Sequence, residues 1–438
     1  MKFKNGKSIL KHCRVMTLGE ICMRITSGGT PKRNNPDFYE NGSCPWVKTQ
    51  ELHDSWIEDT EEHITLSAIE NSSTKLLPFE TILMAMYGAT VGKLGILRRE
   101  MTCNQACCAL IVDKSNADPI YLFYLLKFHR PQIKSLATGA AQQNLSVTQI
   151  SQFSFPFPNL EEQRAIAHIL GTLDDKIELN RRMNETLEAM AQAIFKSWFV
   201  DFDPVRAKME GRETGLPKEI ADLFPDSFED SELGEIPRGW GVGSIGESFN
   251  IVMGQSPPGE SYNTVGEGIP FYQGSADFGS RFPKRRVFCF SPKRFANAGD
   301  TLISVRAPVG EINMALEDCC IGRGVAAARH KTNSRSYTYY FMYVFSEMFD
   351  HFEAEGTVFG SINKNDFNNI QCIVPPVGLI ESYEKTISIL DSHVENNDQI
   401  VQLLSDLRDI LLPKLLSGEI RINNIDIFEK IQITLAED

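Results

Sequence analysis

An internal repeat is the most informative feature of this 438-residue chain: Gly28–Pro31 reads GGTP, and Gly254–Pro257 reads GQSP. The motif ahead of it is repeated as well, since LGE at 18–20 returns as IGE at 245–247. The offset between the copies drifts from 227 to 217 residues along the chain, as expected where loops differ in length and the elements between them do not. The sequence therefore predicts two related copies with pseudo-two-fold symmetry.

Each copy combines short β-like runs with an aromatic helix, the pattern of a mixed α/β domain. Asp118 and Pro119 suit the N-cap and the first position of a helix. Apolar residues at helical spacing indicate a core helix rather than a base-stacking surface, both at 121–126 and at 339–344. The β-like runs, separated by Gly and Pro, predict a mixed sheet and include 81–86, 94–97, 109–112, 301–305 and 325–328.

A strongly periodic acidic segment follows each copy. Apolar residues recur at alternating steps of four and three, from Ile166 to Trp198 and again from Ile387 to Leu415, which is typical of a coiled-coil seam. Asn180 and Asn397 occupy equivalent seam positions, where a polar residue can fix the register of a helix pair. An asparagine near solvent with no such role is an equally good explanation. The residues expected to pair the helices are Leu173, Ile177, Asn180, Leu187, Leu390, Val394, Asn397 and Leu404.

The formal net charge of -13 argues at first against a nucleic-acid ligand, because binding to DNA rests largely on cations that neutralise phosphates. The acidity is unevenly distributed: residues 1–158 carry +3, 159–240 carry -8, 241–376 carry -1 and 377–438 carry -7. The two copies are thus close to neutral and can present basic faces. Composition otherwise predicts an ordinary globular protein with no apolar stretch long enough to cross a membrane.

Basic and polar side chains gather in the expected loops of both copies. The first copy offers Lys32, Arg33, Asn34, Lys48 and Gln50, and the second offers Gln273, Arg281, Lys284, Arg285, Arg286, Lys293 and Arg294. In the second copy the cations alternate with Phe282, Phe288 and Phe290, as in a surface that follows a phosphate backbone. Arg and Lys can read guanine, and Asn and Gln can read adenine, but any single one of these residues can equally be a solvated loop charge.

Motifs for catalysis, metal ions and cofactors are missing from the sequence. GATVGK at 88–93 lacks both the spacing and the Ser or Thr of a phosphate loop, and the ten cysteines contain no C-x-x-C pair. NPDF at 35–38 only half resembles the motif of amino-methyltransferases. We therefore expect no catalytic residue, no metal site and no bound cofactor.

The order of the elements, together with six short strings, resembles the specificity subunit of type I restriction-modification systems. The strings are GGTP at 28–31, CPWV at 44–47, LEEQRAI at 160–166, FKSWF at 195–199, IPRGW at 236–240 and LLPKLLSG at 411–418. The resemblance covers nearly the whole chain, from about Leu18 to Ile420. It departs from the family pattern at 377–381, where VGLIE replaces the expected glutamine-rich entry to the second helix.

The resemblance implies an α+β fold in which two pseudo-symmetric mixed α/β target recognition domains are separated by two long helices pairing as an antiparallel coiled coil. The implied boundaries are 1–158 and 241–376 for the recognition domains, 159–200 and 377–420 for the helices, 201–240 for a connector and 421–438 for a tail. Each domain would read one half of a bipartite double-stranded DNA site. A helix from Ile166 to Trp198 would span roughly 50 Å, enough to hold two readers about one DNA turn apart.

The absence of a membrane span and of the apolar core of a secretory signal predicts a cytoplasmic protein. The resemblance implies that this subunit is non-catalytic. Two methyltransferase subunits would dock on the helices and modify adenine with S-adenosylmethionine, and motor-nuclease subunits would join them to cut unmethylated DNA. Two alternatives from other classes remain: a coiled-coil scaffold that reads no DNA, and a duplicated DNA-modifying enzyme. Methylation by the chain alone would support the enzyme, and failure to bind DNA with partners present would support the scaffold.

Overall fold

The computed structural model describes residues 13–137, 144–306, 308–346 and 361–422, so most of the expected tail lies outside the described residues. The chain forms two units, each with its own core. Unit 1 comprises Met1–Asn180 and Gln399–Asp438, and unit 2 comprises Arg181–Asp398. Each unit therefore contains one copy of the repeat and one part of each long helix.

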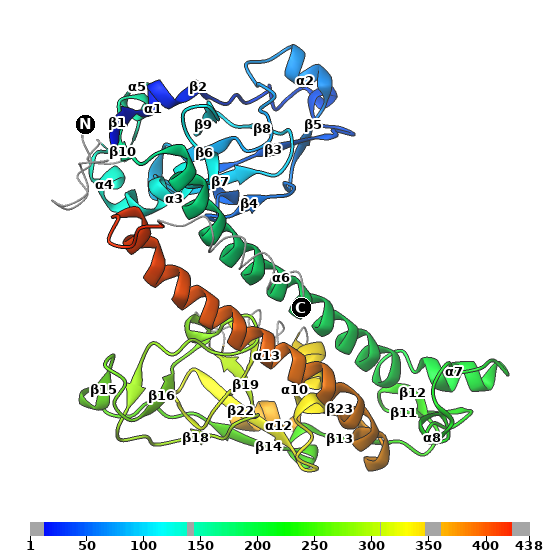
Figure 1. Cartoon of the computed structure of the whole chain (residues 1–438). Helices are drawn as coiled ribbons and strands as arrows, with labels where there is room; N and C mark the ends of the chain where they lie inside the picture. Colours follow the sequence, from blue (N-terminus) through cyan, green and yellow to red (C-terminus); the bar gives the residue numbers. More distant parts are fainter. Residues whose placement is uncertain (1–12, 138–143, 307, 347–360, 423–438) are drawn as a thin grey trace. The chain divides into compact units, whose positions relative to one another are not determined.

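Unit 1 is built on a five-stranded sheet of order β2-β9-β6-β7-β4, a three-stranded sheet of order β5-β3-β8 and the pair β1-β10 (Figure 1). The strands are β1 (Arg14–Thr17), β2 (Cys22–Ser27), β3 (Cys44–Val47), β4 (Trp56–Ile57), β5 (His63–Ile64), β6 (Ile82–Ala85), β7 (Leu94–Leu97), β8 (Thr102–Cys103), β9 (Cys107–Val112) and β10 (Ser154–Phe157). The short helices are α1 (Leu18–Ile21), α2 (Leu66–Glu70), α3 (Pro119–Phe128), α4 (Arg130–Ser135) and α5 (Val147–Ser151).

Unit 2 repeats this plan with a four-stranded sheet of order β14-β22-β19-β20, a five-stranded sheet of order β15-β17-β16-β21-β18 and the pair β13-β23. The strands are β13 (Gly241–Ser244), β14 (Phe249–Met253), β15 (Tyr262–Asn263), β16 (Ile269–Tyr272), β17 (Phe288–Cys289), β18 (Phe295–Ala296), β19 (Thr301–Val305), β20 (Val309–Met314), β21 (Cys319–Ile321), β22 (Val325–His330) and β23 (Gln371–Val374). Its helices are α9 (Ile245–Ser248), α10 (Arg335–Phe345) and α12 (Lys364–Asn369). The connector adds α7 (Asp203–Met209), α8 (Lys218–Ala221), and the hairpin of β11 (Phe228–Ser231) and β12 (Gly234–Pro237).

The repeated LGE and IGE motifs begin the same structure in both units. Each forms one helical turn with a capping box, in which the side chains of Thr17 and Glu20 in unit 1, and of Ser244 and Glu247 in unit 2, satisfy backbone amides reciprocally. The first residue of each turn then donates to the strand end that leads toward a long helix: Leu18 N–H to Phe153 O and Ile245 N–H to Ile370 O, both at 2.9 Å. The predicted repeat is thus confirmed at the level of individual hydrogen bonds.

The first glycine of each repeated tetrapeptide permits a close approach between two backbone segments. Gly28 donates to the carbonyl of Cys107 at 3.1 Å, and Gly254 donates to the carbonyl of Val325 at 2.9 Å. A Cβ at Gly28 would lie 2.1 Å from the carbonyl oxygen of Cys103, and one at Gly254 would lie 2.1 Å from that of Gly322. Glycine is required at both positions because the space for any side chain is filled by backbone.

Helices α3 and α10 lie in the cores, as the aromatic stretches predict. Tyr121 and Leu122 of α3 are buried in unit 1, and Tyr337 and Tyr340 of α10 are buried in unit 2. Asp118 caps α3 by accepting from the amide of Tyr121 at 2.9 Å. In unit 2, α10 packs against β19, β20 and β22 (Figure 1).

The long helices are α6 (Leu160–Phe199) and α13 (Val377–Leu416), close to the expected limits. Contacts within each unit show that they run antiparallel. In unit 2, Tyr383 Oη donates to Ala191 O at 3.0 Å, while Asn397, further along α13, contacts Asn184, earlier in α6. In unit 1, Arg408 contacts Asp174 at 2.6 Å.

The eight residues expected to pair the helices are all buried or half-buried. Ile177 and Val394 are the most deeply placed. Asn180, however, donates to Lys176 O of its own helix at 2.8 Å. The contact between two asparagine side chains across the helices is made in unit 2 by Asn184 and Asn397 instead.

Candidate nucleic-acid interface

The first loop cluster surrounds β3 in unit 1, where Arg33 lies over two aromatic rings. Its guanidinium carbon is 4.9 Å from the ring centroid of Tyr39 and 4.8 Å from that of Trp46. Trp46 is itself buried and donates from Nε1 to Gly29 O at 3.0 Å, so the GGTP segment fixes the platform under the arginine. Beside it an open pocket of about 520 Å³ is lined by Arg33, Pro36, Tyr39, Glu40, Glu62 and His63.

Glu62 neutralises part of the charge of the two cations expected to contact DNA in this cluster. It forms an ion pair with Arg33 and another with Lys48, whose Nζ is 2.9 Å from Glu62 and from Glu61. The hydrogen bond from Arg33 holds the pKa of Glu62 below its ordinary value. Glu62 therefore competes with a phosphate or a base edge for the donors of both cations. Lys32, Asn34 and Gln50 are exposed in the same loops.

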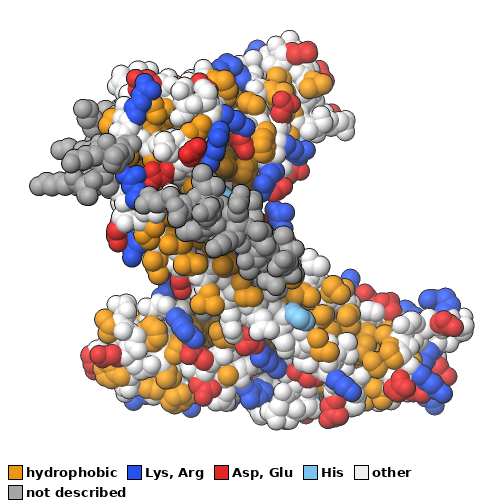
Figure 2. All heavy atoms as spheres, viewed as in Figure 1, with side chains coloured by type: hydrophobic (Ala, Val, Ile, Leu, Met, Phe, Trp, Pro, Cys, Tyr) orange, Lys and Arg blue, Asp and Glu red, His pale blue; other side chains and the backbone are white. Residues whose placement is uncertain are grey.

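The second loop cluster lies between β16 and β18 in unit 2 and contains both paired and exposed cations. Arg286 pairs with Asp277 and donates to Ala276 O at 2.7 Å, and Arg285 pairs with Glu317. Gln273, Lys284, Lys293 and Arg294 are exposed, and Phe290 and Phe295 are exposed near them in the sequence. The face drawn in Figure 2 shows Lys and Arg side chains interspersed with Asp and Glu in each unit.

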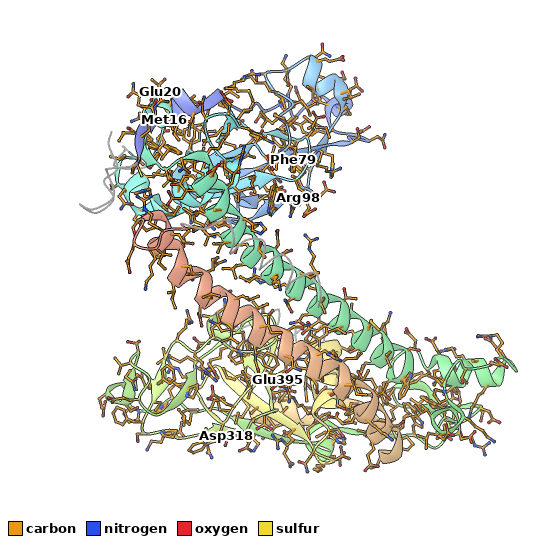
Figure 3. All side chains as sticks on the ribbon, in the orientation of Figure 1. Met16, Glu20, Phe79, Arg98, Asp318 and Glu395 are labelled. Carbon is orange, nitrogen blue, oxygen red and sulfur yellow. The ribbon has the colours of Figure 1, made fainter. Side chains whose placement is uncertain are left out.

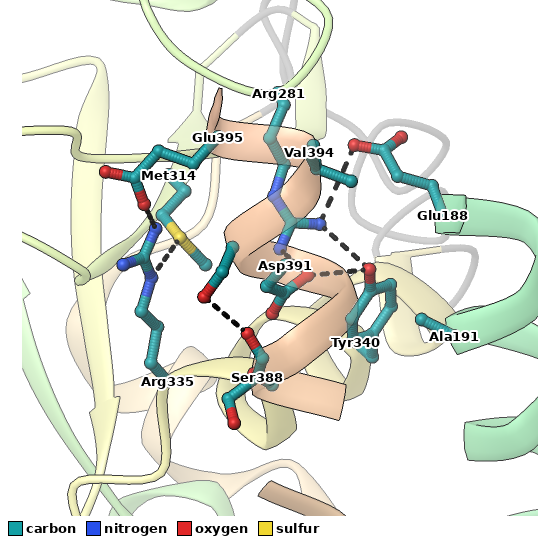
Figure 4. A network of polar contacts seen from close by, with 12 residues as sticks. Glu188, Ala191, Arg281, Met314, Arg335, Tyr340, Ser388, Asp391, Val394 and Glu395 are labelled. Carbon is teal, nitrogen blue, oxygen red and sulfur yellow. Dashed lines mark hydrogen bonds and ion pairs between the residues drawn. The ribbon is translucent and has the colours of Figure 1, made fainter. Parts of the chain in front are cut away.

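Arg281 does not belong to this exposed set, which corrects its sequence-based assignment to a DNA-contacting surface. Only 2% of its surface is exposed, and its Nη2 lies 2.8 Å from Asp391 Oδ1 on α13 (Figure 4). Its position in a run of basic residues predicts a phosphate contact. The side chain instead points into the core, because it pairs there with the buried carboxylate of Asp391. A guanidinium in this position cannot reach a DNA backbone.

Unit 1 also carries an aromatic and basic patch that sequence reasoning missed. The guanidinium of Arg98 lies 4.0 Å from the ring centroid of Trp56, and that ring stacks on Phe79 with centroids 6.0 Å apart. Phe79 and Arg98 are marked in Figure 3, and Phe79 is 47% exposed. Such a surface suits stacking and phosphate contact. The three residues are far apart in sequence, so no local signal brought them together.

The described residues contain no group of three or more His, Cys, Asp or Glu side chains placed to hold a metal ion. The ten cysteines are unpaired thiols, most of them buried, and burial raises the pKa of Cys372 to about 11. A buried thiol with a raised pKa, such as that of Cys372, is a poor nucleophile. Across the helices that the structure describes, none combines the length and the apolar character of a membrane span.

Known proteins with related sequences and folds are consistent with this picture. The family model of the type I restriction modification DNA specificity domain matches residues 11–189 and 237–411, more than half of the chain. The type I restriction enzyme MjaIX specificity subunit of Methanocaldococcus jannaschii is 25% identical, over 94% of this chain and 94% of its own length. The HindI specificity subunit of Haemophilus influenzae is 27% identical, over 69% of this chain and 77% of its own length.

A solved structure shows the same fold. The crystal structure of the type I restriction-modification system S subunit from M. genitalium matches with a TM-score of 0.62 and 18% identity, covering 94% of this chain and 98% of that one. The duplicated family model coincides with the two copies of the repeat, and each copy presents a loop cluster on a shared framework. The chain therefore belongs to the family of type I restriction-modification DNA specificity subunits.

Proposed function

We propose that residues 1–158 and 241–376 are two target recognition domains, each of which reads one half of a bipartite double-stranded DNA site. The long helices at 159–200 and 377–420 would hold the domains, 201–240 would connect them, and 421–438 would form a tail. The proposal rests on the observation that the two domains share one framework but differ in their loops. Gly28 and Gly254 make equivalent hydrogen bonds, whereas the cations that follow them differ in number, spacing and partners.

Shared frameworks with divergent loops suit a protein that must present two different base-reading surfaces in related orientations. In the first loop cluster, Arg33 and Lys48 are restrained by Glu62 over an aromatic platform. In the second, Lys293 and Arg294 extend into solvent. Contacts of the first kind favour directional base readout, and contacts of the second kind favour phosphate neutralisation.

The helices would set the separation of the half-sites. Each has 40 residues, and a straight helix of that length spans about 60 Å. One turn of DNA rises about 34 Å, so continuous helices are long enough to place two readers on successive turns. The unread spacer of the site would then follow from helix length rather than from base contacts.

Partner subunits would supply the chemistry. Exposed apolar residues on α13 recur at steps of three and four, which leaves a stripe suited to packing against further helices. The stripe comprises Ile400, Leu403, Leu407 and Ile410, with Leu403 69% exposed. We propose that two methyltransferase subunits dock on the helices, that motor-nuclease subunits join them, and that the assembly acts on DNA in the cytoplasm. The chain itself would contribute no reacting group.

The decisive experiment is co-expression with the neighbouring methyltransferase subunit in a host that lacks adenine methylation, followed by sequencing of genomic methyladenine. A single bipartite motif with a fixed gap is expected. A matched variant, Lys293→Ala/Arg294→Ala, should lower methylation without creating a new motif. A complex that assembles and leaves no methylation would contradict the reading role and favour a scaffold, whereas methylation by the chain alone would favour an enzyme.

A further inference from the structure

The buried Arg281 connects the second recognition domain to both long helices within unit 2. Its Nη2 contacts Asp391 Oδ1 of α13 at 2.8 Å, and its Nη1 contacts Tyr340 Oη of α10 at 3.3 Å. Glu188 of α6 lies 3.8 Å from Nη1, and the guanidinium sits 3.4 Å from the ring centroid of Tyr339 (Figure 4). Tyr340 also donates to Asp391 at 3.1 Å. One loop cation is thus held by three helices.

Two further carboxylates on the same face of α13 contact the same domain. Glu384, Asp391 and Glu395 are separated by seven and four residues, which places them on one side of a helix. Glu384 accepts from the backbone amides of Ser336 at 2.8 Å and Tyr337 at 3.1 Å, at the N-terminus of α10. A carboxylate there satisfies amides that a helix leaves unpaired.

Glu395 completes this face by pairing with Arg335, the first residue of α10, at 2.9 Å. In Figure 4 the Arg335–Glu395 pair and the Arg281–Asp391 pair lie at neighbouring points along α13. The domain is therefore attached to the helix at three points through directional polar contacts, in addition to apolar packing.

Unit 1 contains a related contact, with one difference. Tyr124 Oη donates to Asp174 of α6 at 2.6 Å. Tyr124 and Tyr340 are each the sixth residue of their helices, and Asp174 and Asp391 are related by the offset of 217 that aligns the long helices. The arginine on Asp174, however, is Arg408 of α13 and not a residue of the recognition domain.

The same Tyr–Asp pair therefore binds a different arginine in each unit. In unit 1 Arg408 joins one long helix to the other, and in unit 2 Arg281 joins the recognition domain to the helices. Buried ion pairs add little net stability, but their strict geometry restricts the arrangements in which the charges are satisfied. A displaced second domain would leave Arg281 and Asp391 buried without partners.

We propose that Arg281, Tyr340 and Asp391 form a latch that fixes the orientation of the second recognition domain on the helix pair, with Arg281 as a positioning residue for half-site spacing. The inference rests on the proposed function, because spacing has meaning only for a chain that reads two half-sites. It assigns to the second domain a buried arginine restraint, whereas the arginine contact of the first domain with a long helix, Arg98 with Asp175 at 3.7 Å, is partly exposed to solvent. Loss of the latch should therefore relax spacing rather than abolish reading.

The test uses the full chain assembled with its methyltransferase subunit and a plasmid library that carries the bipartite site with the native gap, one base pair fewer or one more. Arg281→Met/Asp391→Leu removes both charges, so that neither is left buried alone. Arg281→Lys keeps the charge and loses the two-armed geometry, and serves if the double variant does not assemble. Arg329→Met/Asp300→Asn is the matched control, since that ion pair joins β22 to the residue before β19 within the domain.

The double variant should raise methylation of the altered gaps relative to the native gap by about tenfold, a factor that corresponds to 1.4 kcal/mol, and Arg281→Lys should raise it less. The control should keep the wild-type ratio. An unchanged ratio in an assembled Arg281 variant would overturn the latch. A uniform loss at all gaps would also overturn it, by showing a role in stability alone. Absence of bipartite methylation by the wild type would instead contradict the proposed function.

Discussion

Asn397 of α13 donates its side-chain amide to Oδ1 of Asn184 on α6 at 2.9 Å. Asn184 donates in turn to the backbone carbonyl of Val394 at 3.2 Å, so both side-chain amides have a partner across the helix pair. Asn397 is only 8% exposed. The two asparagines form this hydrogen bond in only one register of the helices, and in other registers their buried amides would lack partners. The pair therefore specifies the register more than it adds to stability.

Asn397→Leu should destabilise the chain, because it leaves Oδ1 of Asn184 without its partner in a half-buried site. We expect a loss of about 1–2 kcal/mol, visible as a lower melting temperature. Asn184→Leu/Asn397→Leu should recover the loss and weaken the preference for one register. Asn180→Leu is the control, since that amide bonds to its own helix. A higher melting temperature for the single Asn397 variant would contradict this account.

Gly28→Ala should disrupt unit 1, because the new Cβ would lie 2.1 Å from a backbone oxygen that cannot move without shifting β8. Overpacking costs about 1–3 kcal/mol, and the upper end is expected where the obstructing atom belongs to the backbone. Gly254→Ala should have a similar effect on unit 2, as expected for equivalent positions. Gly259→Ala, whose Cβ would meet nothing within 4 Å, is the control. Melting temperature and yield of folded protein report the difference, and near-native values for Gly28→Ala would refute the close approach.

The repeat, the mixed sheets and the two long helices could be predicted from the sequence, because each leaves a periodic or repeated signal. The seam spacing selected Ile177 and Val394, and both are buried. It could not say which residues meet, since equivalent positions of an antiparallel pair do not face each other. Asn180 and Asn397 are equivalent by sequence, yet the hydrogen bond joins Asn397 to Asn184.

The site was harder to predict, because a basic run has the same composition whether its members are exposed or buried. Arg281 and Lys284 are three residues apart, and one is in the core while the other is exposed. The difference depends on Asp391, which follows more than a hundred residues later. The pairing of Arg33 with Glu62 and the patch around Trp56 are long-range in the same way.

His330 should make stability depend on pH in the acidic range. Burial lowers its pKa to about 4, and its Nδ1 lies 2.8 Å from the hydroxyl of Thr332. The unfolded chain, with the ordinary pKa of 6.5, binds the proton more readily. The contribution of His330 to the free energy of unfolding is therefore fully present above pH 6.5 and is lost as the pH falls toward 4. At pH 5 the loss amounts to about 2 kcal/mol.

His330→Val is the matched variant, because Val112 occupies the equivalent position opposite β2 in unit 1. Its melting temperature should fall less between pH 7 and pH 5 than that of the wild type. Burial also lowers the pKa of His129 to about 4, but this residue is present in both proteins and contributes equally to both pH profiles. Parallel pH profiles would show that the His330 proton does not contribute.

Lys293 and Arg294 should contribute to DNA affinity through phosphates. Lys293→Ala/Arg294→Ala in the methyltransferase complex should weaken binding to specific and unrelated DNA alike, and lower the slope of log affinity against log salt by about 2. Lys218→Ala/Arg238→Ala removes the same charge from the connector and should leave the slope unchanged. A loss confined to the specific site would instead indicate base readout by these residues.

Leu403 should contribute to assembly rather than to folding, since it is 69% exposed on α13. Leu403→Glu introduces a charge into the apolar stripe with Ile400 and Leu407 and should weaken co-purification with the methyltransferase subunit, while the isolated chain keeps its melting temperature. Val265→Glu, at a position 77% exposed in a loop of unit 2, carries the same change away from the stripe and should assemble normally. If this face of α13 is a packed helix interface, the glutamate of Leu403→Glu would be buried there without a partner and would prevent docking. Equal assembly of both variants would therefore show that the docking surface lies elsewhere.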